Sequence, residues 1–172
     1  DSLLGPVRRS QRKDVNVHEV LERVVTLIAS EHREAVKLIR DYDPSLPPLS
    51  ADPDQLMQAL LNITRNAVQS IAQDGHVIFR TRALTNFPIG AIRHKLVLSI
   101  EIEDNGPGVP ADLAESIFYP LVTGRPDGTG LGLPISQDLV SRHGGLIEYQ
   151  SRPGRTVFTV RLPAVAPAPE VA

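Results

Sequence analysis

The sequence predicts an α/β domain in which three helices pack against a sheet of about five strands. Helical spacing is the first observation behind this prediction, because apolar residues recur at intervals of three and four in two segments, and a glycine cluster opens a third helix. The second is that five other segments show the short alternating or continuous apolar runs of strands. In chain order these are a helix at 17–29, a strand at 36–42, a helix from 53 to a stop at 75, strands at 76–82 and 96–102, a helix at 131–143, and strands at 146–150 and 156–162.

Composition limits the class of protein before any motif is considered. Apolar residues make up 41% and charged residues 22% of the 172 residues, which is typical of a soluble globular domain with a core. The net charge of −2 gives no overall basic field for nucleic acid or acidic membranes. Cysteine is absent, which excludes disulfides and thiolate metal sites and suits the cytoplasm. No apolar run approaches the ~18 residues of a membrane span, and no signal peptide opens the sequence.

The start of the sequence is expected to be a linker. Because the sequence begins at Asp1 rather than with methionine, we expect a fragment of a longer protein. A basic run with no aromatic residue follows Gly5-Pro6, and this favours a solvated linker over a nucleic-acid site. Asn16 is a predicted N-cap for the helix at 17–29. The strand at 36–42 ends in a proline-rich loop at 43–48.

The second helix has a clear start and an unusual polar face. Asp52 is the predicted N-cap, Pro53 fits the first helical position, and Gln55 is suited to a capping box. Asn62 and Asn66 lie four residues apart and therefore share one face. Two asparagines on one face of a strong helix indicate a polar cavity, where an amide oxygen suits magnesium. The alternative is a pair of ordinary surface asparagines.

A carboxylate and closely spaced glycines follow the strand at 96–102. This strand and the one at 76–82, joined by a predicted loop at 85–93, are most simply antiparallel. Asp104 comes at the end of the buried run, and Gly106 and Gly108 allow close backbone approach of a ligand. We expect Asp104 to bind the base of a nucleotide.

A second glycine cluster opens the helix at 131–143. Free N–H groups and the helix dipole favour a phosphate there. The spacing of the glycines differs from a dinucleotide-binding fingerprint, and no apolar parallel strand precedes them, so that alternative is rejected. Before the cluster we expect a short helix at 112–118 and a mobile lid at 119–129.

The last elements are marked by glycine and proline. Gly144-Gly145 predicts a left-handed helix end, and His143 before it is interpreted as a cap or a packed side chain rather than a ligand. The final two strands follow, joined through a turn at 152–155. The tail from Pro163 onward, rich in alanine, proline and valine, is expected to be disordered.

Five short motifs, in order, resemble the boxes of one known superfamily. By these motifs the chain is identified as a member of the Bergerat ATP-binding superfamily, which is shared with gyrase B and MutL, and it resembles the catalytic domain of sensor histidine kinases. The likeness covers about residues 16–163. The motifs are Asn62-Ile63-Thr64-Arg65-Asn66-Ala67 (N box), Asp104-Asn105-Gly106-Pro107-Gly108 (first glycine box), Ile117-Phe118-Tyr119-Pro120-Leu121 (F box), Gly128-Thr129-Gly130-Leu131-Gly132-Leu133 (second glycine box) and Gly154-Arg155-Thr156-Val157-Phe158 (last glycine-threonine element).

The resemblance implies a fold and a division of the chain. The expected fold is a two-layer α/β sandwich, with a mixed, mostly antiparallel sheet of about five strands, three helices and an ATP lid. Residues 1–15 would be the end of a dimerisation helix and a linker, residues 16–163 the ATP-binding catalytic domain, and residues 164–172 a disordered tail.

The resemblance also implies roles for individual residues. Asp104 would accept a hydrogen bond from the adenine amine, and Thr156 would add a hydroxyl on the same edge. Asn66 would bind Mg²⁺, with Asn62 supporting the metal or the phosphates one turn earlier. The other residues expected to bind the nucleotide are Gly106, Gly108, Val109, Thr123, Gly128, Thr129, Gly130, Leu131, Gly132 and Leu133.

Departures from the family pattern sharpen the functional prediction. ATP-hydrolysing members place glutamate at the position of Asn62, and asparagine cannot act as that general base, so phosphoryl transfer is favoured over hydrolysis. The phosphoacceptor motif is absent, because His18-Glu19 lacks the Asn-Pro that should follow, and the acceptor histidine is expected outside this chain. Gln69 stands where many such kinases carry lysine. Arg125 in the lid is therefore our candidate for meeting phosphate charge as a catalytic residue.

Two phrases of sequence, at 39–47 and 118–125, further resemble the nitrogen-regulation kinase NtrB. This likeness implies transfer to a histidine of the protein's own dimerisation domain, then signalling to a response regulator of the NtrC type under control by a PII signalling protein. It implies a homodimeric full-length protein and a monomeric fragment. From composition and hydropathy we expect no nucleic-acid or membrane partner. The alternatives are an ATP-hydrolysing member of the superfamily, or a regulatory module that binds nucleotide and partner without transfer.

Overall fold

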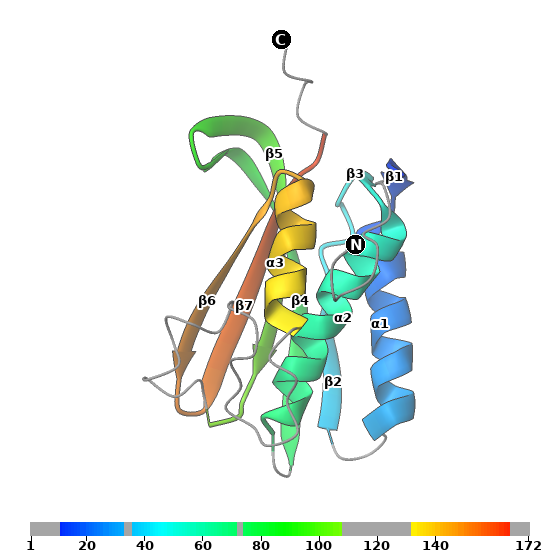
Figure 1. Cartoon of the computed structure of the whole chain (residues 1–172). Helices are drawn as coiled ribbons and strands as arrows, with labels where there is room; N and C mark the ends of the chain where they lie inside the picture. The colour runs from blue at the N-terminus through cyan, green and yellow to red at the C-terminus, as the bar shows by residue number, and fades with distance from the viewer. Residues whose placement is uncertain (1–10, 33–35, 72–73, 108–131, 166–172) are drawn as a thin grey trace.

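A computed structural model describes residues 11–32, 36–71, 74–107 and 132–165 as a two-layer α/β sandwich, in which three helices cover one face of a sheet (Figure 1). The predicted fold class is confirmed. The helices are α1 (Val17–His32), α2 (Pro53–Gln69) and α3 (Gly132–Arg142); the strands are β1 (Lys13–Val15), β2 (Val36–Asp41), β3 (Leu49–Ala51), β4 (Gly75–Ile89), β5 (Ile92–Asp104), β6 (Leu146–Arg152) and β7 (Arg155–Pro163).

The main sheet has the strand order β2-β4-β5-β7-β6. Only β2 and β4 pair in parallel, and the other three pairs are antiparallel. The sheet is thus mixed and mostly antiparallel, as predicted. β5 lies at its centre, so the residue that ends this strand is flanked by β4 and β7 on either side.

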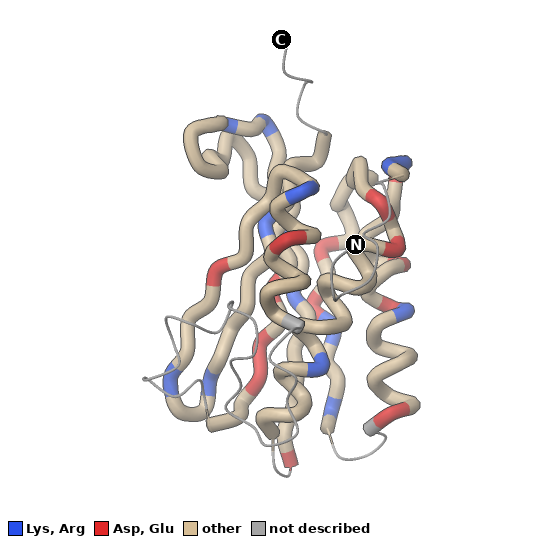
Figure 2. Tube along the Cα trace, in the orientation of Figure 1, with Lys and Arg blue, Asp and Glu red and all other residues tan. Residues whose placement is uncertain are grey.

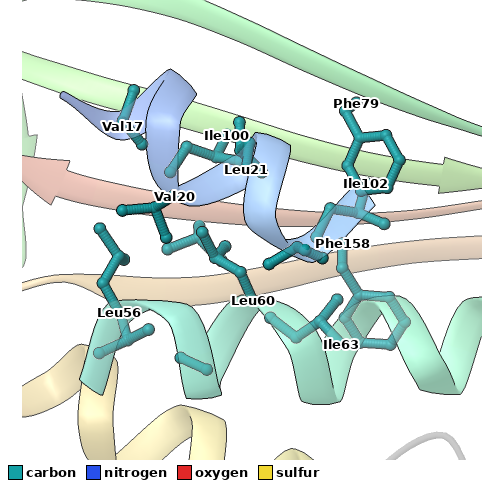
Figure 3. Close-up of a cluster of buried hydrophobic side chains, with 14 of the residues drawn as sticks. Val17, Val20, Leu21, Leu56, Leu60, Ile63, Phe79, Ile100, Ile102 and Phe158 are labelled. Atoms are coloured by element: carbon teal, nitrogen blue, oxygen red, sulfur yellow. The ribbon is translucent and has the colours of Figure 1, made fainter. Parts of the chain in front are cut away.

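The sheet and the helices share one apolar core (Figure 3). Phe79, Ile102 and Phe158 project from β4, β5 and β7 and have no exposed surface. They meet Leu21 of α1 and Ile63 of α2, which are equally buried. Fully burying an aliphatic or aromatic side chain of this size stabilises the fold by about 1.5–3 kcal/mol. This packing fixes α2 over the central strands, where the site lies.

The hairpin between β4 and β5 is much longer than the sequence predicts. The loop expected at 85–93 is wrong, because the ladder continues through Phe87↔His94 and Pro88↔Arg93 to a turn at Gly90 (φ 60°). Proline has no backbone N–H to donate to a neighbouring strand. Pro88 is tolerated because β2 pairs with β4 only as far as Arg80, so β4 has no partner strand on that side at Pro88. Figure 1 shows this arm curling beyond the rest of the sheet.

The end of α2 also differs from the prediction. The helix stops at Gln69 with Ser70 as its C-cap, so Gly75 does not end it and instead begins β4. Ile71, which falls within the range predicted to be helical, lies after the helix and packs half-buried against the core. A side chain on Gly75 would collide with Ile71, and this contact explains the glycine better than a helix stop does.

The other helix ends agree with the chemistry of their caps. Asn16 caps α1, since its Oδ1 accepts from the His18 backbone N–H at 2.9 Å, although α1 runs three residues beyond the predicted end. Asp52 caps α2 by accepting from the N–H groups of Asp54 and Gln55. Gly144 ends α3 in the left-handed region (φ 75°), with its own N–H and that of the next residue closing back onto the last turn.

His143 is a packed structural residue, as predicted. It is buried, and its Nδ1 donates to the Leu139 carbonyl at 2.8 Å. Its Nε2 accepts from the backbone N–H of Asp52 at 3.1 Å, which fixes the neutral tautomer. The histidine thereby joins the end of α3 to the start of α2.

The entering and leaving segments are tied to the same end of the domain. β1 pairs with β3 in a two-stranded sheet that the sequence does not predict, because three-residue strands show no period. Gln11 donates its backbone N–H to Asp52 Oδ2 at 2.8 Å. The segment before α1 is therefore bound to the start of α2. The tail expected to be disordered is ordered in its first residues, since Pro163 ends β7 and buried Ala164 accepts from the Ser50 N–H.

Charged residues of both signs are interspersed along the described trace (Figure 2). This distribution fits the net charge of −2. Within the same residues, no helix combines the length and apolar character that crossing a membrane requires.

Candidate nucleotide site

Asp104 ends the central strand β5 as a buried carboxylate. Its side chain is 2% exposed, and its neighbours across the sheet are Val77 of β4 and Thr156 of β7. Alternation along β5 directs Ile100, Ile102 and Asp104 to the same face, which the helices cover. Asp104 is therefore the polar end of a row that is otherwise core.

Hydrogen bonds fix the orientation of the Asp104 carboxylate. Its Oδ1 accepts the Gly106 backbone N–H at 2.9 Å and lies 3.5 Å from the Ser70 hydroxyl at the end of α2. Burial raises the pKa of Asp104, and the Gly106 N–H opposes that rise. Because both bonds use Oδ1, Oδ2 receives neither of them. A buried, oriented acceptor of this kind is suited to a ligand N–H group.

Close packing explains the glycine at position 106. A Cβ there would lie 2.9 Å from the Ser70 hydroxyl and 3.0 Å from the Ser70 carbonyl oxygen. The Gly106 carbonyl also accepts the Gly154 N–H at 2.9 Å, which joins the first glycine motif to the turn before Thr156. The two motifs, separated by about fifty residues of chain, meet in one corner of the fold.

A polar row along α2 leads to this corner. The row consists of Asn62, Asn66 and Ser70, which follow one another at intervals of four and therefore share one side of the helix. Both asparagines are half-buried. Ser70 reaches Asp104. One turn before Asn62, the Ala59 carbonyl accepts the Ser136 hydroxyl of α3 at 2.8 Å. The row therefore runs beside α3 and ends at the carboxylate.

Thr156 and Ser151 extend the polar corner across the sheet. Thr156 is 3% exposed, and its hydroxyl lies 2.8 Å from that of Ser151 on β6. Sequence analysis missed Ser151 and Ser70. Ser70 had a signal, namely its spacing of four from Asn66, whereas Ser151 becomes apparent only once β6 and β7 are paired.

The second glycine motif is described only at its end. Gly132 begins α3, and Leu133 is buried in the core, as an anchor for the start of this helix. The remaining predicted site residues lie outside the described residues, as do the predicted short helix at 112–118 and the lid at 119–129. These site residues are Gly108, Val109, Thr123, Arg125, Gly128, Thr129, Gly130 and Leu131.

His18 has a structural environment far from this corner. Its ring stacks on Tyr42 with 4.6 Å between centroids, and its Nε2 lies 2.8 Å from the Thr81 hydroxyl. Burial lowers the pKa of His18, which keeps the ring neutral. A side chain held in this way is not placed to serve as a phosphoacceptor.

The donor set fits magnesium bound together with phosphate. Among the described residues, no group of three or more histidine, cysteine, aspartate or glutamate side chains is placed to hold a metal ion. Asn62 and Asn66 offer amide oxygens, which are hard, neutral ligands. Magnesium commonly keeps water and takes substrate phosphates with only one or two protein ligands, so this sparse set fits it.

Comparison with known proteins gives the family. Residues 51–166 match the family model described as histidine kinase-, DNA gyrase B- and HSP90-like ATPase. The chain is 50% identical over 164 residues to the sensory histidine kinase/phosphatase NtrB of Escherichia coli O157:H7, and this match covers 95% of the chain and 47% of that protein. NtrB of Rhodobacter capsulatus is 43% identical over 168 residues, with 95% and 46% covered. The chain thus spans about half the length of these relatives.

Solved structures share the fold. The nucleotide-free catalytic domain of histidine kinase ThkA superposes with a TM-score of 0.76 at 24% identity, covering 90% of this chain and 96% of that one. Full-length ShkA in complex with AMPPNP gives a TM-score of 0.77 at 26% identity, covering 97% of this chain and 34% of that one. The chain belongs to the histidine kinase-, DNA gyrase B- and HSP90-like ATPase family, as an ATP-binding catalytic domain of the histidine kinase type.

Proposed function

We propose that this domain binds ATP with Mg²⁺ and transfers the γ-phosphoryl group to a histidine of a dimerisation domain, as part of an NtrB-like kinase. The observation that carries the proposal is the junction of α2 with β5, where the row Asn62–Asn66–Ser70 ends at the buried Asp104 carboxylate. This junction supports a base site at Asp104 and a metal site at the asparagines of the same row.

Asp104 supplies the recognition of the base. A buried carboxylate whose Oδ1 is held by the Gly106 N–H is a strong acceptor for an exocyclic amine. Guanine carries a carbonyl oxygen where adenine carries this amine, and two acceptors would repel each other. The likeness to ShkA, solved in complex with AMPPNP, supports an adenine nucleotide as the ligand.

Asn66 and Asn62 act at the phosphate end of the row. Asn66 would hold Mg²⁺ through its amide oxygen, and Asn62 would support the metal or the phosphates from one turn earlier. The metal, when bound, offsets the negative charge of the phosphate oxygens. The glycines of the second motif would allow backbone N–H groups close to these oxygens. Arg125 is our candidate for a further positive charge.

Asn62 is also the reason for proposing transfer rather than hydrolysis. A neutral amide cannot take a proton from water as a carboxylate can. The domain would therefore provide position and charge, while the nucleophile comes from the acceptor histidine. A module that binds nucleotide without transfer is the alternative that the experiment below separates.

The 43–50% identity to NtrB proteins supports a role in nitrogen regulation for the whole protein. In that role a homodimer in the cytoplasm would pass the phosphoryl group to a response regulator of the NtrC type. A PII signalling protein would control the balance of its activities. These partners are what the resemblance to NtrB implies, and each belongs to the proposal.

The test is transfer in trans. The chain is mixed with γ-labelled ATP, Mg²⁺ and a separately produced dimerisation domain, and acid-labile label on histidine is measured. We expect label with the wild-type chain, loss of most label with Asn66→Ala, and full label with the control Gln58→Ala, an exposed residue of the same helix. ATP binding without any labelled histidine would leave only a nucleotide-binding module and contradict the proposal.

A further inference from the structure

A second line of polar side chains, separate from the polar row on α2, crosses three strands at the site. Asp104 of β5 is the cross-strand partner of Thr156 on β7, and Thr156 is in turn the partner of Ser151 on β6. Direct partners in an antiparallel pair project from the same side of the sheet. The two hydroxyl groups of Thr156 and Ser151 lie 2.8 Å apart, which is the distance of an O–H···O hydrogen bond.

One hydroxyl donates its proton to the other, and the direction of this bond decides whether Thr156 is a donor or an acceptor toward a ligand. If Ser151 donates to Thr156, the Thr156 proton is directed elsewhere and Thr156 acts as a donor toward a ligand. If Thr156 donates to Ser151, Thr156 presents only lone pairs. The 2.8 Å distance fits both directions of the bond, and only the direction in which Ser151 donates leaves the Thr156 proton for a ligand.

We propose that Ser151 is a positioning residue that sets Thr156 as a hydrogen-bond donor and thereby contributes to the choice of adenine over hypoxanthine. This inference rests on the proposed ATP site. Next to the Asp104 acceptor, a donor at Thr156 matches the amine and the adjacent ring nitrogen N1 of adenine. Hypoxanthine reverses both groups, with a carbonyl oxygen and an N–H. The pair Asp104 and Thr156 reads this pattern, and Ser151 holds it in one orientation.

The burial of Asp104 and Thr156 is what makes a mismatched base costly. Asp104 and Thr156 are 2% and 3% exposed, so neither side chain could turn to water for a hydrogen bond when the base presents a mismatched group. Ser151 is half-buried on the edge strand, behind Thr156 as seen from Asp104. It orients Thr156 without being a direct partner of Asp104.

The experiment compares the affinities of the chain for ATP and for inosine triphosphate by calorimetry in Mg²⁺. Ser151→Ala is expected to lower the ATP preference by about fivefold, the equivalent of one net hydrogen bond. Ser151→Thr keeps the hydroxyl and should restore the preference. Thr159→Ala removes a hydroxyl from the opposite face of β7 and should leave the preference unchanged. In a Thr156→Val background, Ser151→Ala should have no further effect.

The outcomes separate this inference from the proposed function. A wild-type chain that does not bind ATP overturns the proposed function and this inference with it. A wild-type chain that prefers ATP, with the same preference in Ser151→Ala, overturns the positioning role alone. Equal weakening of both nucleotides by Ser151→Ala also overturns it, because that result indicates general packing rather than polarity.

Discussion

At the scale of single residues, the buried carboxylate of Asp104 is expected to favour ligand binding and to lower the stability of the fold. Burial raises its pKa, so folding disfavours its charged form, and the cost is present at every pH above the ordinary pKa of the group. The Gly106 N–H offsets only part of that cost. The same desolvation makes the carboxylate a strong acceptor for a ligand donor. A functional carboxylate in this position is expected to weaken the fold that holds it.

Asp104→Asn separates these two effects. The asparagine Oδ1 can keep the Gly106 N–H bond, and a neutral amide has no charge to desolvate, so the melting temperature at pH 7 should rise. The affinity for ATP should fall about 10- to 100-fold, because a hydrogen bond to a charged group contributes about 1.5–3 kcal/mol. Thermal unfolding and calorimetry measure the two effects. A folded variant with unchanged ATP affinity would remove Asp104 from the base site.

His143 gives the fold a dependence on pH with a defined sign. Burial lowers its pKa below the ordinary value of 6.5, so the unfolded chain binds the proton more readily than the folded one. Its stabilising contribution is therefore complete above about pH 6.5 and is lost as the pH falls toward the lowered pKa. Asp52, which favours the charged ring, and Arg12, which disfavours it, are the charged groups facing it.

The measurement is urea unfolding at pH 7.5 and pH 5.5. The wild-type chain should lose stability at the lower pH, and His143→Gln should lose less. His18, whose pKa is also lowered by burial, contributes in the same direction in both proteins, so only the difference between them is diagnostic. Identical pH dependence in the two proteins would show that His143 is not the titrating group.

At the scale of elements, caps and cross-strand contacts decide where α2 lies over the site. The Asp52 carboxylate holds the start of the helix by accepting from two backbone N–H groups of the first turn. It also accepts the backbone N–H of Gln11. Ser70 and Gly106 pack at its other end, against Asp104. The helix start was predictable because its cap residues are local in sequence. The C-terminal end was not, because the contact of Gly75 with Ile71 follows from tertiary packing.

Asp52→Ala tests the cap. Loss of an N-cap costs about 0.5–2 kcal/mol of unfolding free energy, and the additional bond to Gln11 places the expected value in the upper half of that range. Asp14→Ala, which removes an exposed carboxylate from β1, should change stability by less than about 0.5 kcal/mol. Equal effects of the two substitutions in chemical unfolding would contradict a capping role for Asp52.

At the scale of the whole molecule, the periodic segments were predictable and the polar corner only in part. The five strands of the main sheet and the three helices have regular apolar patterns, and the motif residues Asp104 and Asn66 carry their own signals. Three-residue strands such as β1 have no pattern to detect. The long β4–β5 hairpin was hidden because Pro88 indicates a loop, although the free edge of β4 tolerates it. Ser151 required the strand pairing itself.

The fate of the γ-phosphoryl group is the most direct test of the account as a whole. With Asn62 in place of a carboxylate base, the chain should label the histidine of an added dimerisation domain and release little inorganic phosphate. Both products are measured from one reaction with γ-labelled ATP and Mg²⁺, with phosphate release in the same mixture without the chain as the baseline. Labelled histidine with phosphate near that baseline is the predicted result. Phosphate release without labelled histidine would contradict it and identify the domain as a hydrolase.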